Sequence, residues 1–322
     1  MAAWGGADVT IDNVTGTALE PGVAGLSRGK FLDAEVMSHL SVTHCTMHGV
    51  SSGIYVVSSM LASINIRDNV ADNLEDRKSD GNGGFLLNQR VLGHFIMFNG
   101  DAMPNGGEVA WNQMINSDGV ASVEDLISFY QSHGSPEGPV LVHDNYLQGA
   151  FATGQTTGYT GAGMQMDGAS NDPLTATGFV QIKNNTIVHL AGSGISIAAG
   201  HDISVIGNRI VSCGKDSSGN WIAMPGSSAL VMWNYYQTSQ YFNNYMANNS
   251  GGLVRPDADG NPSVGDVGAP SVSSSLNNVI GANFFEQPCL ASSNPNLAAE
   301  SLEKAKWFNT VAQSGELLGD QH

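Results

Sequence analysis

Short runs of alternating apolar and polar residues recur along most of the chain, each entered through Gly or Ser. Residues 53–56, 84–87, 163–166 and 194–197 are examples, and Gly, Asn, Asp and Ser interrupt the chain between such runs. Alternation over four to six residues indicates a β-strand, because successive side chains of a strand point to opposite faces. The pattern therefore predicts a protein built mainly from short β-strands.

A second pattern indicates that these strands belong to a repeat. Six segments share an apolar residue, two variable residues, Asn, one variable residue and another apolar residue: 109–114, 142–147, 182–187, 205–210, 241–246 and 280–285. Segment 66–71 fits except for the weakly apolar Ala71, and segment 42–47 has Cys in place of Asn. The central residues are Cys45, Asn69, Asn112, Asn145, Asn185, Asn208, Asn244 and Asn283, with shortest intervals of 23 and 24 residues. Strands that recur once per ~20–50 residues indicate a solenoid.

Together, the strands and the Asn segments resemble the right-handed parallel β-helices of the pectin-lyase-like superfamily, over roughly residues 40–285. The resemblance implies three strands per coil and a ladder of stacked Asn side chains at the bend after the second strand. Asn suits that bend because it tolerates left-handed backbone geometry and carries both a donor and an acceptor. We therefore expect an all-β fold, a right-handed parallel β-helix (solenoid) of about eight coils, with Cys45 buried at the end of the ladder.

The C-terminal region predicts a helical cap. Residues 297–311 combine the apolar Leu302, Ala305, Phe308 and Val311 with charged residues, in the spacing of a short amphipathic helix. Because a solenoid needs a cap at an open end, we expect this capping segment, at about 290–313, to close the last coil. We expect a single parallel β-helix domain over residues 1–322, with a repeat core at about 40–285.

The resemblance also implies that ligands lie along a groove formed by the first strand of each coil. When apolar side chains are placed inward, two rows point outward: Tyr55, Leu86, Ser128, Gln165, Ser196 and Val231, and beside them Val57, Asn88, Tyr130, Asp167, Ala198 and Trp233. Such a groove suits sugars, which stack on aromatic rings and exchange hydrogen bonds with amides and carboxylates. The predicted substrate-binding residues are Tyr55, Asn88, Ser128, Gln165 and Trp233.

Acidic residues gather just before one groove strand, where residues 118–130 contain three carboxylates. Hydrolysis of a glycosidic bond needs two carboxyl groups, one as acid and one as base or nucleophile. Asp167 with Glu124 or Asp125 is the predicted catalytic pair, and Tyr130 and His133 are predicted to assist. Two other interpretations stay open. The same acids could hold Ca²⁺, which prefers several oxygen ligands, or they could only cap a turn and end a strand, so no metal site is assigned.

Composition and charge narrow the class of partner. The 322 residues include 40 Gly, and 12 Lys+Arg stand against 29 Asp+Glu, for a formal net charge of −17. Nucleic-acid binding needs clustered cations and is not expected, nor is a transmembrane helix, since no run of about 18 apolar residues exists. An acidic protein should also repel a polyuronate unless Ca²⁺ or a local basic patch intervenes. The expected partner is a polysaccharide or oligosaccharide, and assembly into homo-oligomers stays open.

The cysteines and the start of the chain bear on localisation. Cys45, Cys213 and Cys289 lie far apart without CxxC spacing, which argues against structural zinc, and their odd number leaves the redox compartment open. The first residues lack the basic and apolar regions of a signal peptide. Because the strand-like pattern begins already at Val9, we expect a secreted or periplasmic protein whose signal peptide has been removed.

These observations predict an extracytoplasmic carbohydrate-active protein that cleaves a polysaccharide, with hydrolysis slightly favoured over β-elimination. A lyase on this fold usually uses a Lys or Arg base, and none of the predicted outward groove positions carries either residue. The alternative is a non-catalytic β-helix that binds a glycan or serves as a structural surface module, because a fold does not by itself imply a function.

Overall fold

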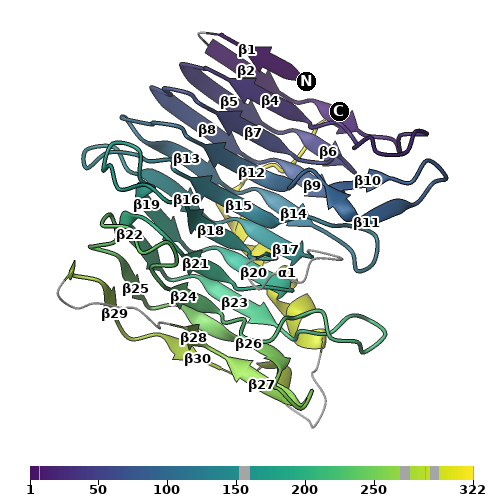
Figure 1. The fold of residues 1–322 in the computed structure, drawn as a ribbon, viewed down its shortest axis with the longest axis vertical. Coiled ribbons are helices and arrows are strands. Elements are labelled where there is room, and N and C mark those ends of the chain that lie inside the picture. The colour runs from purple at the N-terminus through teal and green to yellow at the C-terminus, as the bar shows by residue number, and fades with distance from the viewer. Residues whose placement is uncertain (7, 152–159, 269–275, 287, 291–296, 322) are drawn as a thin grey trace.

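Three long parallel sheets run the length of the molecule and wind it into a parallel β-helix (Figure 1). The computed structural model describes residues 1–6, 8–151, 160–268, 276–286, 288–290 and 297–321. Coil after coil, the chain adds one strand to the first sheet, one to the second and one to the third. The predicted fold class is confirmed.

The strands of the three sheets are short. The first sheet contains β1 (Ala2–Trp4), β4 (Leu32–Glu35), β7 (Ile54–Val57), β12 (His94–Asn99), β15 (Asp125–Tyr130), β18 (Met164–Asp167), β21 (Ile195–Ile197), β24 (Leu230–Met232) and β28 (Val267–Gly268). The second contains β2 (Asp8–Asp12), β5 (His39–Thr43), β8 (Ser63–Arg67), β13 (Gly107–Ala110), β16 (Val140–His143), β19 (Gly178–Lys183), β22 (His201–Ile206), β25 (Tyr245–Ala247) and β29 (Val279–Ile280). The third contains β3 (Thr15–Thr17), β6 (Thr46–His48), β9 (Val70–Asp72), β14 (Gln113–Ile115), β17 (Tyr146–Ala150), β20 (Thr186–Leu190), β23 (Arg209–Ser212) and β26 (Ser250–Pro256), with β27 (Pro262–Gly265) antiparallel and β30 (Phe284–Phe285) parallel to β26.

The solenoid begins earlier than the expected start of the repeat at residue 40. Strands β1, β2 and β3 already form a complete coil within residues 2–17. The register that pairs Thr15 with Thr46 places Val14 opposite Cys45, at the ladder position of this first coil. The Asn template missed this coil because Val, with no side-chain donor or acceptor, stands where the other coils carry Asn or Cys.

Stacked apolar side chains fill the interior. One stack of paired residues in the first sheet runs Ile54, Ile96, Ile127, Met164, Ile195 and Leu230, and all six are buried in one hydrophobic core. Two positions further along the strands, Phe98 and Phe129 stack with ring centroids 4.9 Å apart. Because neighbouring coils lie ~4.8 Å apart, like side chains pack directly on one another, so the core is continuous along the helix axis.

An Asn ladder follows the bend between the second and third sheets. The side-chain amide of Asn69 donates to Asn112 Oδ1 at 2.9 Å, and the same bond links Asn112 to Asn145, Asn145 to Asn185 and Asn185 to Asn208. The backbone N–H of Cys45 donates to Asn69 Oδ1 at 3.0 Å, so the buried Cys45 ends the ladder as predicted. The left-handed residue is the one before the ladder residue, for example Asp144 (φ 54°) before Asn145. Asn is therefore present for its hydrogen bonds rather than for its backbone geometry.

The sequence prediction for the seventh ladder residue is wrong. Asn208 donates to Asn249, and Asn249 to Asn283, so Asn244 is not in this ladder. Asn244 lies before β25 instead, at the preceding bend, where Asn244 Oδ1 accepts from the backbone N–H of Ile203. Asn249 escaped the template because Gly251 occupies the second apolar position. A Cβ at Gly251 would lie 1.8 Å from Ile210 O, so the close approach of two coils excludes an apolar side chain there.

The predicted C-terminal helix is α1 (Ala298–Ser314), which ends at the left-handed Gly315. Of the expected apolar face, Val311 is buried but Leu302 and Phe308 are exposed, and Trp307 is buried instead. It lies against β20 and β23 on the outside of the third sheet (Figure 1). Trp307 packs on Tyr146 with ring centroids 5.5 Å apart and donates from Nε1 to Asp144 O at 2.9 Å. Within the described residues, no helix is both long and apolar enough to cross a membrane.

Two further links tie the C-terminal region to the coils. A disulfide joins Cys213, just after β23, to Cys289 in the short 3₁₀ helix η2 (Pro288–Leu290). Beyond α1 the chain runs back to the first coils, where Glu316 pairs with Arg67 at 2.8 Å and Gly319 N donates to Asp68 O. The two ends of the chain therefore lie near one another (Figure 1). Residues 298–321 therefore pack along the outside of the solenoid, from β23 back to the first coils.

Candidate functional site

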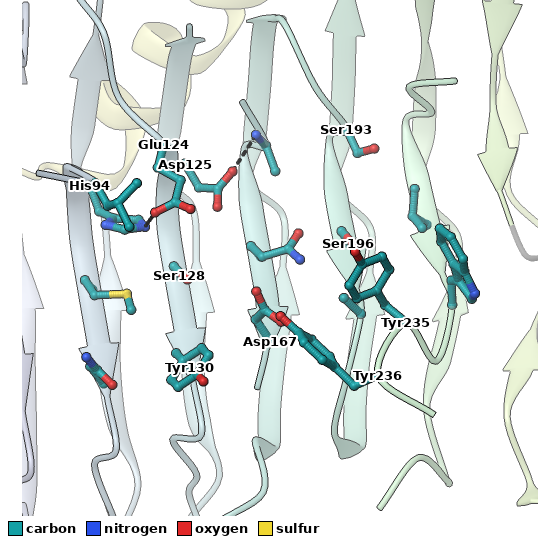
Figure 2. A pocket seen from close by; sticks show the side chains of 18 of the residues that line it. His94, Glu124, Asp125, Ser128, Tyr130, Asp167, Ser193, Ser196, Tyr235 and Tyr236 are labelled. Atoms are coloured by element: carbon teal, nitrogen blue, oxygen red, sulfur yellow. Dashed lines mark hydrogen bonds and ion pairs between the residues drawn. The ribbon is translucent and has the colours of Figure 1, made fainter. Parts of the chain in front are cut away.

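A groove of about 850 Å³ lies on the outer face of the first sheet, across six strands from β7 to β24. Figure 2 shows side chains from these strands projecting into it. Of the ten residues predicted for a site, eight line it: Tyr55, Glu124, Asp125, Ser128, Tyr130, Gln165, Asp167 and Trp233. The structure thus brings most of the predicted site residues together on one face.

Two positions of the predicted outward rows are wrong. Asn88 and Leu86 belong to β11 (Phe85–Arg90), which forms an antiparallel hairpin with β10 (Arg77–Ser79) outside the three long sheets. The strand next to β7 in the first sheet is β12, which places Met97 and Asn99 in the groove instead. The alternation expected for residues 84–87 does not occur in β11, where Leu87, Asn88 and Gln89 are all exposed. The four central residues of β12, 95–98, are all apolar and carry no alternation.

His133 is also placed outside the groove. It follows β15 at the bend toward the second sheet, with its Nδ1 2.8 Å from Gly134 O, and it does not line the groove. Tyr130, three residues earlier, does line the groove. Beyond the end of β15 the chain bends toward the second sheet. His133 therefore lies away from the acids, although it is only three residues from Tyr130.

A shift in the inward–outward alternation explains how His94 and Asp125 reach the groove. Phe95 and Ile96 are consecutive residues of β12, and both are buried in the core. The residues opposite them on β15, Leu126 and Ile127, are buried in the same way. Two consecutive inward residues move the residue before them to the outer face, where His94 and Asp125 pair in register. Simple period-2 counting would have assigned both residues to the interior.

Glu124 is strongly affected by its surroundings. Its backbone N–H donates to Gly93 O at 2.9 Å, which holds it beside β12, and its Oε2 lies 3.4 Å from His94 Nε2 (Figure 2). Burial, followed by the charges of Asp76 and Asp167, raises the pKa of Glu124 to about 7, against the opposing charge of Arg90. A carboxyl group in this state keeps its proton close to neutrality and can donate it.

Asp125 has a more enclosed position. Its Oδ1 accepts a hydrogen bond from the backbone N–H of Ala162 at 2.7 Å. Burial raises the pKa of Asp125 well above its usual range, and the neighbouring Glu124 raises it further. Asp125 therefore secures the start of the next coil, and Glu124, with its side chain 19 % exposed, is the acid that a ligand can reach.

Asp167 ends β18 on the neighbouring coil, level with Tyr130. Its Oδ1 accepts from the backbone N–H of Gly168 at 2.7 Å, and it is hydrogen-bonded to the hydroxyl of Tyr236, whose ring points at it in Figure 2. The backbones of Glu124 and Asp167 lie near opposite ends of their strands, yet the charge of Asp167 contributes to the raised pKa of Glu124. The two carboxyl groups thus face one groove.

Aromatic side chains close the groove at the C-terminal coils. Trp233 and Tyr235 meet edge to face with centroids 5.3 Å apart, and Tyr235 and Tyr236 do so at 5.0 Å. All three are substantially exposed. At the other end, Asn99 Nδ2 donates to the Tyr55 hydroxyl at 2.8 Å, and Lys30 Nζ lies 3.7 Å from the centre of the Tyr55 ring. Lys30 already covers one face of Tyr55, so the more open stacking surfaces are Trp233 and Tyr235.

Sequence reasoning missed several groove residues, among them the polar and aromatic side chains of His94, Asn99, Tyr235 and Tyr236. The aromatic pair directly after Trp233 and Asn234 was a usable signal, because two adjacent exposed Tyr residues are rarely needed for packing. His94 and Asn99 gave no signal, since their strand could not be identified. No cluster of three or more His, Cys, Asp or Glu side chains with the geometry of a metal site occurs in the described part of the chain.

Comparisons with protein-family models, with curated proteins and with solved structures found no significant match to this chain. The fold and the geometry of the groove therefore stand on the chain's own residues.

Proposed function

We propose that this chain is a carbohydrate-active enzyme of the pectin-lyase-like type that hydrolyses glycosidic bonds in an uncharged polysaccharide. The observation that carries the proposal is the pair of carboxyl groups in one groove with different surroundings. Glu124 is largely buried beside His94, and burial raises its pKa to about 7, whereas Asp167 accepts hydrogen bonds from Gly168 N–H and Tyr236. Two carboxyl groups held in different environments are what acid and base roles require.

In the proposed reaction the polysaccharide lies across the coils. Glu124 donates its proton to the glycosidic oxygen as the bond from that oxygen to the anomeric carbon breaks. Asp167 either takes a proton from the water that attacks this carbon or attacks the carbon itself and is released by water in a second step. Tyr236 keeps the Asp167 carboxylate oriented through their hydrogen bond. In the one-step route Asp167 ends protonated and Glu124 ionised, and proton exchange with solvent restores both groups. In the two-step route Glu124 takes the proton of the water that releases the sugar from Asp167, so both groups return to their starting state.

The groove favours a long chain bound along its middle. It spans five strand-to-strand spacings, about 24 Å in total. Glu124 and Asp167 belong to the third and fourth of its six coils, with Tyr55 and Asn99 on one side and Trp233 and Tyr235 on the other. Sugar units can therefore bind on both sides of the scissile bond, which supports cleavage within a chain.

Charge supports an uncharged substrate. The carboxyl side chains that line the groove are Glu124, Asp125 and Asp167, and the lining residues of the described chain include neither Lys nor Arg. With the overall net charge of −17, a polyanion would be repelled during approach and binding. Hydroxyl-rich neutral sugars would instead use the aromatic rings, Gln165 and Asn99.

A panel of soluble neutral and anionic polysaccharides tests this function. We expect new reducing ends from a neutral member, shortening of the chains from their interior, and no ultraviolet absorbance from unsaturated products. Absorbance with an anionic member would instead mean β-elimination. Binding without any new reducing end would favour the glycan-binding module, for which the exposed Trp233–Tyr235–Tyr236 cluster is the specific support.

The proposed acid predicts how activity depends on pH. Glu124 must be protonated to act, and its pKa is raised to about 7, so kcat/KM should fall about tenfold per pH unit above roughly pH 7. The measurement is kcat/KM between pH 4 and 9 on the substrate found in the panel. A rate that stays constant up to pH 9 would assign the proton donation to another group.

We also propose that the protein works outside the cytoplasm. Support comes from the disulfide between Cys213 and Cys289, because such bonds persist mainly in secreted and periplasmic proteins.

A further inference from the structure

His94 is a buried titratable residue beside the proposed acid, and the mechanism above assigns it no role. Its side chain is only 5 % exposed, and its Nε2 lies 3.4 Å from Glu124 Oε2. A small rotation of either side chain would shorten this approach to a hydrogen bond, as is common for catalytic groups before substrate binds. His94 is therefore in place to act on Glu124 rather than on a sugar.

Hydrogen bonds and close packing hold the backbone at His94 in place. His94 N donates to Ser52 Oγ at 3.2 Å, and Gly93 N donates to Asp76 Oδ2 at 3.2 Å. Gly93 is required here, because a Cβ would lie 2.0 Å from Ser51 O. Gly93 O in turn accepts from Glu124 N, so the histidine and the acid are fixed to one segment of backbone.

Burial sets the charge of the pair. It lowers the pKa of His94 to about 4 and raises that of Glu124 to about 7, so between these two values the imidazole is largely uncharged while the carboxyl group largely retains its proton. The charged and titratable groups that surround the pair are Asp125 on β15, Asp167 on β18, and Asp76 and Arg90 from the segment around the β10–β11 hairpin. Three of these four groups are acidic. A proton shared by His94 and Glu124 therefore reduces the electrostatic repulsion between Glu124 and its acidic neighbours.

We propose that His94, as a neutral imidazole protonated at Nδ1, accepts a hydrogen bond at Nε2 from the Glu124 carboxyl group and so holds this acid, with its proton, in the groove. This inference rests on the proposed function, in which Glu124 is the proton donor. His94 is a positioning residue in this arrangement, since it acts through Glu124. The hydrogen bond stabilises the protonated carboxyl group, so its loss lowers the pKa of Glu124.

Two variants separate this role from simple packing. His94→Leu keeps an apolar side chain of similar size but removes the acceptor, whereas His94→Gln can present its amide oxygen near the position of Nε2. For His94→Leu we expect a 10- to 100-fold lower kcat/KM at pH 7, little change in KM, and an alkaline limb of the pH profile about one unit lower. His94→Gln should restore most of the rate and the limb. His48→Gln is the control, because His48 lies on the third sheet with Asp72 as its partner.

Carboxyl carbon NMR of Glu-labelled protein measures the pKa of Glu124 directly in each variant, without substrate. Nitrogen NMR of the wild-type protein reports whether Nε2 of His94 lacks a proton at pH 7, and this needs no variant to fold. A pKa of Glu124 that is unchanged or raised in His94→Leu, or a protonated Nε2 in the wild type, would overturn the proposal. Both NMR measurements can be made even if no polysaccharide is cleaved. They therefore test the hydrogen bond between His94 and Glu124 separately from the proposed function.

Discussion

Replacing Glu124 by Gln is expected to lower the rate of glycosidic cleavage by about 10²- to 10⁴-fold, with KM nearly unchanged. Gln keeps the size and hydrogen-bonding capacity of the side chain beside His94 but has no acidic proton to give to the leaving oxygen. The loss should be far smaller on a synthetic glycoside with a strongly acidic phenol as leaving group, because such a group departs without protonation. Steady-state kinetics on both substrates measure the difference.

Glu137→Gln is the matched control, since Glu137 is exposed and does not line the groove. Its activity should equal that of the unmodified protein. Equal losses on the natural substrate and on the activated glycoside would argue against Glu124 as the proton donor, and an unaffected rate would remove it from the mechanism. Thermal melts of Glu124→Gln exclude unfolding as the cause of a loss.

Replacing Asn145 by Ala in the middle of the ladder is expected to lower the free energy of unfolding by about 3–5 kcal/mol. Asn145 Oδ1 accepts from both the backbone and the side-chain N–H of Asn112, and its Nδ2 donates to Asn185 Oδ1 and Val109 O. Ala leaves several of these buried groups without partners, at about 1–3 kcal/mol each before relaxation. Denaturant unfolding followed by circular dichroism gives the change.

The control for the ladder is Asn82→Ala. Asn82 is an exposed turn residue whose side chain donates only to Asp80 O, at 3.3 Å. Its replacement should change the unfolding free energy by no more than about 0.5 kcal/mol. If Asn145→Ala cost no more than this control, the stacked amides would not be a major source of stability in the solenoid.

Much of the candidate site was predictable from local sequence. Wherever strands of the first sheet alternate cleanly, as β15 and β18 do over residues 127–130 and 164–167, apolar residues placed inward left Ser128, Tyr130, Gln165 and Asp167 outward. Prediction failed where the middle of the strand is a continuous apolar run, as in β12, or where a hairpin strand was taken for a groove strand, as in β11. In both cases the local sequence pattern also fits a different structural environment, so it could not identify the strand that lines the groove.

The repeat, the stacked core and most of the ladder can be read from the sequence, because each depends on residues at fixed short spacings within a coil. Which strand neighbours which across a long insertion depends on the folded chain, and this is why Asn99 rather than Asn88 lies in the groove. The tertiary structure also decided the state of the acids. Glu124 gains its raised pKa from burial and from Asp76 and Asp167, residues 48 and 43 positions away, and such proximity is set by the winding of the coils rather than by any local pattern.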